Sequence, residues 1–353
     1  MKKAYLILSN KTVFEGYKIG ADTESIGEVV FTTGMTGYLE TLTDPSYAGQ
    51  IVVQTFPLIG NYGVISEDFE GRCAVKGYVV RTLCNTPSNF RSEYALDKFL
   101  KEYNVCGICG IDTRKLTKII REQGVMNGMI SDTGAPDIKA IEDYTVGKAV
   151  SAVSSESVCE YKADGEEKYR VALIDYGAKK SMIKCLQKRG CRVTAFPHGA
   201  SAEEILETDP DGIMLSNGPG DPQENSYEIE QIKKLLGKKP LFGICLGHQL
   251  TALAAGGRTV KLKYGHHGAN QPVTERGKNR TYITSQNHNY AVVAESLSGI
   301  GEEIFVNAND GSCEGVSYKG LSAFTVQFHP EANGGPHDTE FLFDRFLAMM
   351  EEK

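Results

Sequence analysis

The sequence predicts an α/β fold in two parts, in which a doubly wound, mostly parallel sheet follows a smaller β-rich α/β domain. Three observations lead to this prediction. The chain has 353 residues, which suggests two domains at roughly 150 residues per domain. After residue 168, short apolar runs alternate with helical patterns, as in a parallel sheet covered by helices. Before residue 146, most apolar runs have the length and spacing of strands.

The composition excludes several classes of protein. Hydrophobic residues make up 41% of the chain, which is enough for a packed core and too many for a disordered protein. The formal net charge of −7 is small and spread along the chain, so we expect no nucleic acid partner and no anionic membrane surface. No stretch approaches the roughly 18 apolar residues of a membrane span.

The cysteines indicate a reducing compartment. Their number is odd, their spacing is irregular, and a chain of this size needs no disulfide bonds to fold. We therefore expect free thiols and a cytoplasmic protein. The start of the chain agrees, because the apolar run at residues 4–8 is shorter than the core of a signal peptide. The nine cysteines are Cys73, Cys84, Cys106, Cys109, Cys159, Cys185, Cys191, Cys245 and Cys313.

The first domain is predicted at residues 1–145. Apolar runs on either side of a polar turn predict a hairpin, and further runs predict a strand and two helices, the second capped by Asp112. Glycine-rich segments between them predict loops. The predicted strands are residues 4–8, 12–14 and 28–32, the loops 33–38 and 43–47, and the helices 92–103 and 112–122.

Residues 146–168 are small, polar and charged, which predicts a linker before a second domain at 169–353. In that domain, strands and helices alternate with short connections, and Ser201 with Glu204 forms a capping box at the start of a helix. The strands are predicted at residues 171–175, 192–196, 212–216, 241–244, 282–284, 304–307 and 323–328. The helices are predicted at residues 180–188, 201 onward, 227–236, 248–255 and 338–350.

Cys245 is the candidate nucleophile. Open α/β sheets bind ligands beyond the carboxyl ends of their strands, and Cys245 follows the predicted strand 241–244. Gly243 and Gly247 permit the sharp strand-to-helix turn of a nucleophile elbow. The helix that follows stabilises a thiolate, and the N–H of Leu246 can hold an oxyanion. The alternative is a buried structural cysteine, which is the more common role of this residue.

A thiolate nucleophile needs a base, and His329 is the best candidate. It ends the predicted strand 323–328, so its imidazole is expected at the same edge of the sheet as Cys245. Pro330 turns the chain, which allows Glu331 to fold back and orient the imidazole. The alternative is a surface histidine at a strand end.

A third loop, at residues 217–222, follows the predicted strand 212–216. Two glycines and two prolines in six residues make a rigid turn whose exposed N–H groups suit an oxyanion or a carboxylate. Taken alone, the loop would be interpreted as a simple tight turn.

These three motifs together resemble those of the class I glutamine amidotransferases, and the resemblance implies a flavodoxin-like fold for the second domain of this chain. They read Gly-Ile-Cys-Leu-Gly-His-Gln at 243–249, Asn-Gly-Pro-Gly-Asp-Pro at 217–222 and His-Pro-Glu at 329–331. Further segments are similar to the small, glutamine-hydrolysing subunits of carbamoyl-phosphate synthases, and this resemblance runs from about residue 4 to 348. Those segments are residues 33–38, 42–47, 60–63, 87–91, 110–114, 264–268 and 285–288.

The resemblance implies a role for each site residue. Cys245 would attack the side-chain amide of L-glutamine, His329 would protonate the departing ammonia and then activate water, and Glu331 would orient His329. The N–H groups of Leu246 and Gly218 would hold the oxyanion. Six residues would hold the α-amino and α-carboxyl groups of glutamine, namely Ser46, Gly220, Gln249, Asn287, Asn289 and Tyr290. The last two stand where the family usually has Gly-Phe.

The resemblance also implies a partner. A large synthetase subunit would receive the ammonia and use ATP and a divalent metal to make carbamoyl phosphate from bicarbonate. This chain itself contains no Walker loop and no G-x-G-x-x-G after a strand. We therefore expect neither nucleotide, metal nor other cofactor in this chain.

Two other functions fit parts of the sequence. One is the amidotransferase subunit of another complex, such as anthranilate or aminodeoxychorismate synthase, but the first-domain motifs argue against it. The other is a non-catalytic adaptor of a synthetase, but such a protein would be expected to lack Cys245, His329 or Glu331.

Two further motifs are expected to be structural. Cys106-Gly107-Ile108-Cys109 lacks a second cysteine or histidine pair at zinc spacing, and its apolar residues suit a buried segment rather than a redox or metal site. His266 and His267 could be ligands, but are expected in a loop between strands beside the site.

Overall fold

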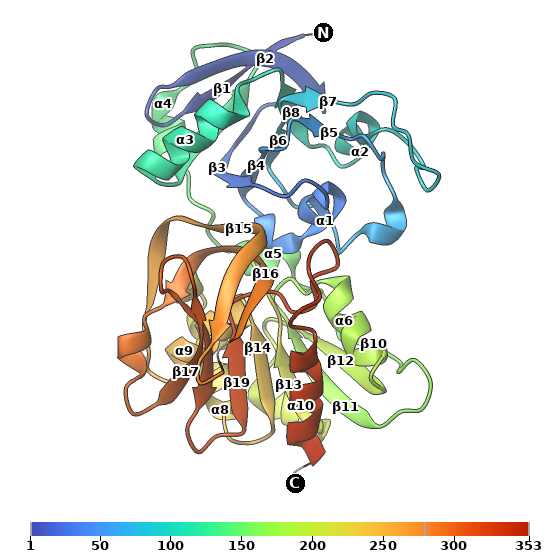
Figure 1. The fold of residues 1–353 in the computed structure, drawn as a ribbon, viewed down its shortest axis with the longest axis vertical. Coiled ribbons are helices and arrows are strands. Elements are labelled where there is room, and N and C mark those ends of the chain that lie inside the picture. Colours follow the sequence, from blue (N-terminus) through green and yellow to red (C-terminus); the bar gives the residue numbers. More distant parts are fainter. Residues whose placement is uncertain (1, 279, 352–353) are drawn as a thin grey trace. The chain divides into compact units, whose positions relative to one another are not determined.

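The computed structural model describes residues 2–278 and 280–351, which divide into two compact units with a boundary between Gly147 and Lys148 (Figure 1). The unit boundary therefore lies at the start of the segment expected to be a linker. Most of that segment belongs to the second unit, where it forms α5 (Ala149–Val153) and β10 (Cys159–Tyr161).

The first unit is built on a closed barrel in the order β1-β2-β8-β6-β4-β3-β9. Closure leaves no unpaired strand edge in the barrel. The strands are β1 (Lys3–Leu8), β2 (Val13–Gly20), β3 (Ser25–Thr32), β4 (Gln50–Gln54), β6 (Gly77–Val79), β8 (Cys106–Cys109) and β9 (Met126–Ser131). A separate two-stranded sheet pairs β5 (Leu58–Ile59) with β7 (Thr82–Leu83).

The helices of the first unit lie in the connections between these strands. They are α1 (Tyr38–Thr43), α2 (Leu96–Glu102), α3 (Thr113–Gln123) and α4 (Ile138–Glu142), with 3-10 turns η1 (Pro45–Tyr47) and η2 (Ser66–Asp68). Asp112 caps α3 as predicted, because its Oδ1 accepts a hydrogen bond from the N–H of Lys115 at 2.9 Å.

The Cys-x-x-C motif forms strand β8 and is buried, as expected for a structural segment. Cys106 and Cys109 are free thiols, and burial raises the pKa of each. Both neighbours of β8 in the barrel, β2 and β6, are far from it in sequence. Closure therefore depends on non-local pairing, which the sequence pattern did not reveal.

The second unit contains a ten-stranded sheet in the order β10-β12-β11-β13-β14-β19-β18-β16-β15-β17. The five strands from β12 to β19 in this order are parallel, as predicted for the doubly wound part. They are β11 (Tyr169–Asp175), β12 (Cys191–Pro197), β13 (Gly212–Leu215), β14 (Leu241–Ile244) and β19 (Ala323–Val326). β10 pairs antiparallel with β12 and forms one edge.

Four antiparallel strands extend the other side of this sheet. They are β15 (Thr259–Glu275), β16 (Arg280–Val292), β17 (Gly301–Asn307) and β18 (Cys313–Tyr318). The expectation that His266 and His267 lie in a loop is wrong, because both lie inside β15, opposite His288 and Asn287 of β16. Gly265 and Gly268 weaken the strand signal there, and the ladder to β16 decides the structure.

Helices cover the two faces of the parallel strands. They are α6 (Lys180–Gln187), α7 (Ala202–Glu207), α8 (Ser226–Leu235), α9 (Leu246–Ala254) and α10 (Phe341–Glu351), with 3-10 turns η3 (Pro222–Glu224) and η4 (Ala294–Leu297). Neighbouring residues of β11 belong to two different hydrophobic cores. Leu173 packs with α6 and α10, whereas Ile174 packs with α7, α8 and α9. This alternation fixes the register of each strand. No helix in residues 2–278 and 280–351 has the length and apolar character needed to cross a membrane.

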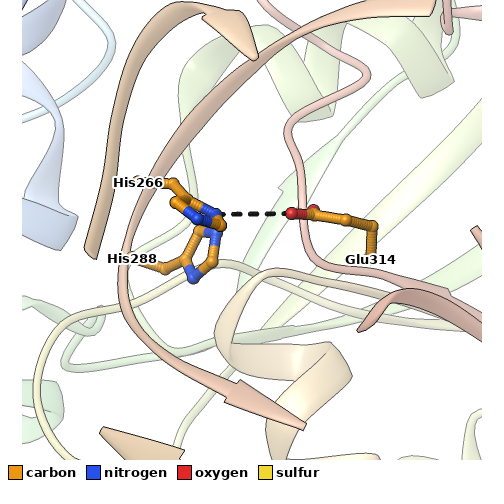
Figure 2. A group of neighbouring side chains, drawn as sticks. All are labelled: His266, His288 and Glu314. Atoms are coloured by element: carbon orange, nitrogen blue, oxygen red, sulfur yellow. Dashed lines mark ion pairs between the residues drawn. The ribbon is translucent and has the colours of Figure 1, made fainter. Parts of the chain in front are cut away.

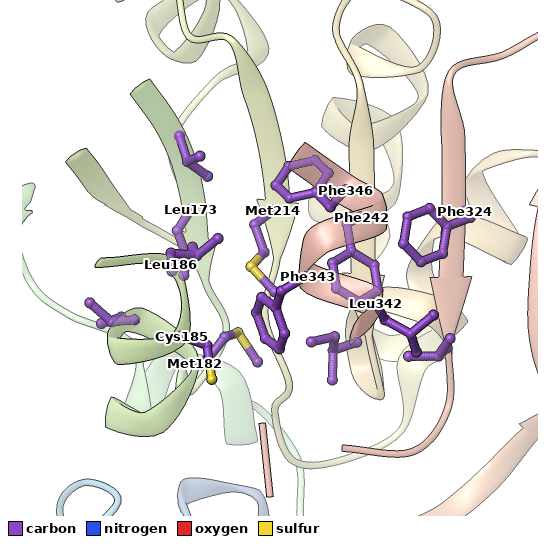
Figure 3. Close-up of a cluster of buried hydrophobic side chains, with 14 of the residues drawn as sticks. Leu173, Met182, Cys185, Leu186, Met214, Phe242, Phe324, Leu342, Phe343 and Phe346 are labelled. Atoms are coloured by element: carbon purple, nitrogen blue, oxygen red, sulfur yellow. The ribbon is translucent and has the colours of Figure 1, made fainter. Parts of the chain in front are cut away.

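Aromatic side chains fill the core beneath α10 (Figure 3). The ring of Phe242 in β14 stacks on that of Phe324 in β19, with 4.4 Å between the ring centroids. The ring of Phe343 in α10 contacts Phe242 edge-on, with 5.7 Å between the centroids. All three side chains are buried. This packing holds β14 and β19 side by side and so fixes the two strand ends that carry Cys245 and His329.

Phe242→Ala should therefore destabilise the second unit by about 3–5 kcal/mol, since it removes a buried ring and leaves a cavity. Urea unfolding followed by far-UV circular dichroism measures the change. Phe90→Ala is the matched control, because Phe90 is 97% exposed, and it should change the stability by less than about 0.5 kcal/mol. Similar losses in the two variants would contradict the packing described.

Candidate active site

Four parallel strands bring the predicted catalytic residues to one edge of the sheet. β11, β13, β14 and β19 are neighbours in that order, so their carboxyl ends lie side by side. The residues that follow these ends are Lys179 after β11, Asn217 and Gly218 after β13, Cys245 after β14, and His329 after β19. The site is therefore assembled by strand order rather than by closeness in sequence.

Cys245 occupies a sharp turn between β14 and α9. Its backbone has φ 53° and ψ −104°, a conformation that residues other than glycine rarely adopt. The flanking glycines make the turn possible. A Cβ on Gly247 would lie 2.5 Å from the carbonyl oxygen of Leu215, and one on Gly243 would lie 2.9 Å from the carbonyl oxygen of Gly247. The turn also uses a hydrogen bond from the N–H of Gly247 to the Ser216 oxygen at 3.0 Å.

The thiol of Cys245 is directed toward β16. Its side chain is buried, and Sγ lies 3.6 Å from the carbonyl oxygen of Asn287, to which it donates a hydrogen bond. Strand β16 thus supplies the wall opposite the nucleophile.

His329 and Glu331 form a buried pair. Nδ1 of His329 lies 2.6 Å from Oε1 of Glu331, and both side chains are at most 1% exposed. Nε2 of His329 has no hydrogen-bond partner among the described residues. The carboxylate therefore holds one ring nitrogen, and the other is available for proton transfer.

Lys179 completes this charged group, although the sequence analysis did not select it. Its Nζ lies 3.3 Å from Oε1 of Glu331 and 3.1 Å from Nδ1 of His329. The side chain is 11% exposed. A buried carboxylate shared by two cationic groups remains ionised, which avoids the large cost of a buried unpaired charge.

The ionisation of the pair follows from these contacts. Burial and Lys179 lower the pKa of His329, but the Glu331 carboxylate and the nearby Cys245 thiol outweigh them and raise that pKa to about 9. Burial raises the pKa of Glu331, but the charges of His329 and Lys179 prevail and lower it to about 2. An imidazolium beside a carboxylate is thus the resting state near neutral pH.

The two backbone N–H groups that were expected to hold an oxyanion are unused in this structure. No hydrogen bond in residues 2–278 and 280–351 uses the N–H of Leu246 or of Gly218. Gly218 packs closely against the loop that follows β11, since a Cβ on Gly218 would lie 2.4 Å from the carbonyl oxygen of Tyr176. Asn217 ties that loop in place by donating from Nδ2 to the oxygen of Gly177 at 2.8 Å.

The residues expected to bind glutamine lie around this centre in the second unit, apart from Ser46. Nε2 of Gln249 donates to the oxygens of Tyr290 at 2.8 Å and Gln327 at 3.0 Å. Asn287 and Asn289 contact opposite ring nitrogens of His267, each at 2.9 Å through Oδ1. The side chains of Gln249, Asn287 and Asn289 are therefore each fixed by hydrogen bonds to neighbouring residues.

The remaining two expected residues lie in turns. Gly220 has φ +92°, which favours glycine, and its position after β13 is the one predicted. Ser46 lies in the first unit within η1, where its N–H donates to Oδ1 of Asp44 at 2.9 Å. Its contribution to a glutamine site stays a prediction.

Asn289 keeps an extended backbone at a position where the family usually has glycine. It lies in the extended strand β16, and its φ is not positive. Its side chain instead contributes to the bridge through His267.

The arrangement supports acyl transfer through a thioester. It offers a buried thiol on a strained turn, an imidazolium with one free nitrogen, a carboxylate that orients the imidazole, and unused N–H groups at Leu246 and Gly218, at the ends of neighbouring strands. Lys179 was missed because it lies in no recognised motif. Its position four residues after the end of β11 is the signal that could have identified it.

Comparison with known families agrees with this site. Residues 6–130 match the model of the carbamoyl-phosphate synthase small chain, CPSase domain, and residues 172–349 match that of glutamine amidotransferase class-I. The carbamoyl phosphate synthase small chain of Clostridium perfringens is 51% identical over 349 residues, covering 98% of this chain and 99% of that one. That of Listeria innocua is 50% identical over 356 residues, covering 100% and 98%.

Among solved structures, a glutamine amidotransferase from Thermotoga maritima has a TM-score of 0.39 and 19% identity, covering 52% of this chain and 84% of that one. This likeness is too low to carry an argument.

Gly247→Ala should destabilise the protein by about 1–3 kcal/mol, because its Cβ would collide with the backbone oxygen of Leu215. This cost exceeds the gain of about 1 kcal/mol in helix propensity. Urea unfolding measures it. Gly199→Ala is the control, since a Cβ there meets nothing within 4 Å, and it should be neutral within about 0.5 kcal/mol. A neutral Gly247→Ala would show that the turn is not tightly packed.

The stability of the wild type should fall relative to Glu331→Gln as the pH rises from 6.5 to about 9. The raised pKa of His329 means that the folded state binds its proton more tightly than the unfolded state, whose pKa is near 6.5. This contribution to the free energy of unfolding is complete below pH 6.5 and is lost as the pH rises to about 9. Its slope is at most about 1.4 kcal/mol per pH unit. The Glu331 carboxylate stays ionised throughout this window.

Urea unfolding at several pH values between 6 and 9.5 tests this. Glu203→Gln, which removes a fully exposed carboxylate, is the control and should differ from the wild type by a constant amount. A constant difference for Glu331→Gln as well would mean that Glu331 does not hold the proton on His329.

Proposed function

This chain belongs to the carbamoyl-phosphate synthase small chain family, and on that premise we propose that it is the glutaminase subunit of a carbamoyl-phosphate synthase. It hydrolyses L-glutamine to glutamate and ammonia. The observation that carries this proposal is the convergence of Cys245, His329 and Glu331 at adjoining ends of parallel strands.

The first half of the reaction forms a thioester. The Cys245 thiolate attacks the side-chain amide carbon of glutamine, and the N–H groups of Leu246 and Gly218 stabilise the negative oxygen that develops. One such donor is worth about 2.7–4 kcal/mol of barrier. The imidazolium of His329 gives its proton to the nitrogen as the carbon–nitrogen bond breaks, so ammonia leaves as a neutral molecule.

The second half releases glutamate. His329 is now neutral and accepts a proton from water, and the resulting hydroxide attacks the thioester carbon. The carbon–sulfur bond breaks, glutamate leaves, and the Cys245 thiolate beside the His329 imidazolium is restored. Glu331 keeps the imidazole in one orientation through both proton transfers, and Lys179 keeps Glu331 ionised.

The α-amino and α-carboxyl groups of glutamine are held by backbone and side-chain groups of the second unit, namely Gly220, Gln249, Asn287, Asn289 and Tyr290. Support comes from the hydrogen bonds that fix β16 beside Cys245. Binding of glutamine then places its side-chain amide against the thiol.

The ammonia passes to a large synthetase subunit, which uses ATP, bicarbonate and a divalent metal. Free ammonia in neutral water would take up a proton and lose its nucleophilicity, so the transfer needs a direct route between the subunits. The match of residues 6–130 favours this partner over that of another synthase. The nine free cysteines support a location in the reducing cytoplasm.

Cys245→Ser, reconstituted with the large subunit, should lose glutamine-dependent carbamoyl phosphate synthesis by at least about a thousandfold and keep ammonia-dependent synthesis. Product formation with each nitrogen donor measures both activities. Cys109→Ser is the matched control, because it changes a similar Gly-Ile-Cys-Gly sequence outside this site, and it should keep both. Glutamine-dependent synthesis in Cys245→Ser would show that the nucleophile is elsewhere.

A further inference from the structure

A second cluster of titratable side chains lies in the antiparallel half of the same sheet (Figure 2). It consists of His266 on β15, His288 on β16 and Glu314 on β18, and all three are buried. One nitrogen from each histidine and one carboxylate oxygen lie within 4.8 Å of one another. The reaction proposed above uses none of these three side chains.

The carboxylate of Glu314 is only partly compensated. Its Oε1 accepts from Nδ2 of Asn307 at 3.0 Å and lies 3.4 Å from Nδ1 of His266. Its Oε2 has no hydrogen-bond partner in residues 2–278 and 280–351, although the side chain is fully buried. A buried carboxylate oxygen without a donor destabilises the fold, so this atom marks a place where a cation would stabilise it.

Both histidines are oriented by a second oxygen. Nε2 of His266 lies 2.8 Å from Oδ2 of Asp310, which leaves Nδ1 facing Glu314. Nδ1 of His288 lies 2.8 Å from the oxygen of Tyr290. An imidazole whose one N–H is fixed by a carboxylate or carbonyl oxygen is the usual arrangement of a metal-ligating histidine.

His288 shows the same imbalance as Glu314. Both of its ring nitrogens face oxygens, and a neutral imidazole carries only one N–H. With that proton on Nδ1, the lone pair on Nε2 faces Oε1 of Gln286 at 3.1 Å. Neither of these two atoms can then donate a hydrogen bond to the other, so the lone pair on Nε2 is available to a metal ion.

We propose that His266, His288 and Glu314 form a binding site for a divalent transition metal ion, with Zn²⁺ as the ion that fits best. Ligand atoms about 2.1 Å from a tetrahedral zinc ion are about 3.4 Å apart, and the distance from His266 Nδ1 to Glu314 Oε1 is 3.4 Å. Two imidazoles with one carboxylate suit zinc, whereas Mg²⁺ and Ca²⁺ prefer oxygen ligands alone. Asp310, whose side chain is 46% exposed, offers a path from solvent.

The site has a structural connection to the nucleophile. His288 is adjacent to Asn287, whose oxygen contacts Cys245, and it shares the oxygen of Tyr290 with Gln249. A metal ion that draws His288 toward Glu314 therefore shifts the wall opposite the thiol. On the proposed function, Zn²⁺ lowers the rate of glutamine hydrolysis.

Zinc binding is tested on the full-length chain in a Cys245→Ser background, which removes a thiolate that could itself bind zinc. Equilibrium dialysis with metal analysis should show that adding Glu314→Gln removes one equivalent of Zn²⁺. Adding Glu228→Gln is the matched control, because Glu228 also pairs with a histidine, His198, at 2.6 Å outside the cluster, and should remove none. Equal zinc content with and without Glu314→Gln would overturn the proposal.

Two further measurements keep the test decisive if Glu314→Gln does not fold. His266→Asn should lose the same equivalent, with circular dichroism as the check on folding. X-ray absorption of the zinc-loaded Cys245→Ser protein should show imidazole and oxygen ligands, and a sulfur ligand or a shell without imidazole would contradict the site. Neither measurement depends on glutaminase activity, so a failure of the proposed function would not affect them.

The consequence for activity is tested separately. Zn²⁺ should inhibit glutamine hydrolysis by the wild type at least tenfold more strongly than by Glu314→Gln. Equal inhibition of the two proteins would place the inhibitory zinc at Cys245 and His329 instead and would contradict the connection through β16.

Discussion

The turn at Cys245 is the constraint on which the rest of the site depends. The positive φ of Cys245 is unfavourable for this residue. Close packing of the flanking glycines against α9 and the neighbouring strand β13 maintains it. Gly247 touches the backbone of β13, and its N–H is bonded to Ser216. The same packing therefore places the buried thiol at the sheet edge, with the unused N–H of Leu246 next to it. Catalytic geometry here is a consequence of close backbone packing.

Charge is balanced around this turn by a small buried network. Glu331 lies between the two cationic groups, Lys179 and His329, so each charge has a partner although water is largely excluded. The strands that carry them come from distant parts of the sequence and meet because β11, β13, β14 and β19 are neighbours. The antiparallel strands add the opposite wall. Among the described residues, Oε2 of Glu314 has no hydrogen-bond partner and Nε2 of His288 faces an oxygen, which is the physical basis of the proposed metal site.

Much of the second unit could be predicted from sequence because its signals are local. Strand β14 has the predicted bounds, since a short apolar run is enough to define a buried parallel strand, and the capping box at Ser201 and Glu204 is present. The long strands β15 and β16 were underestimated because polar residues and glycines interrupt their pattern, and only their mutual pairing makes them strands. The barrel of the first unit was missed for the same reason, as its closure depends on contacts between distant segments.

The candidate site divides in a similar way. Cys245, His329 and Glu331 were predicted because each lies in a local motif at a turn or a strand end. Lys179 and the bridge through His267 were not found, because their roles arise from contacts across the sheet edge that no spacing in the sequence shows. Sequence alone therefore identifies the reacting groups better than the groups that orient them.

The central claim is that Cys245 forms a covalent γ-glutamyl thioester. The most direct measurement is a rapid acid quench of the enzyme during turnover of radiolabelled glutamine, followed by digestion and identification of the labelled peptide. Label is expected on the peptide that contains Cys245, and hydroxylamine should release it, as it does from a thioester. Label on another cysteine, or turnover with no covalent label under conditions where breakdown of the intermediate limits the rate, would contradict it.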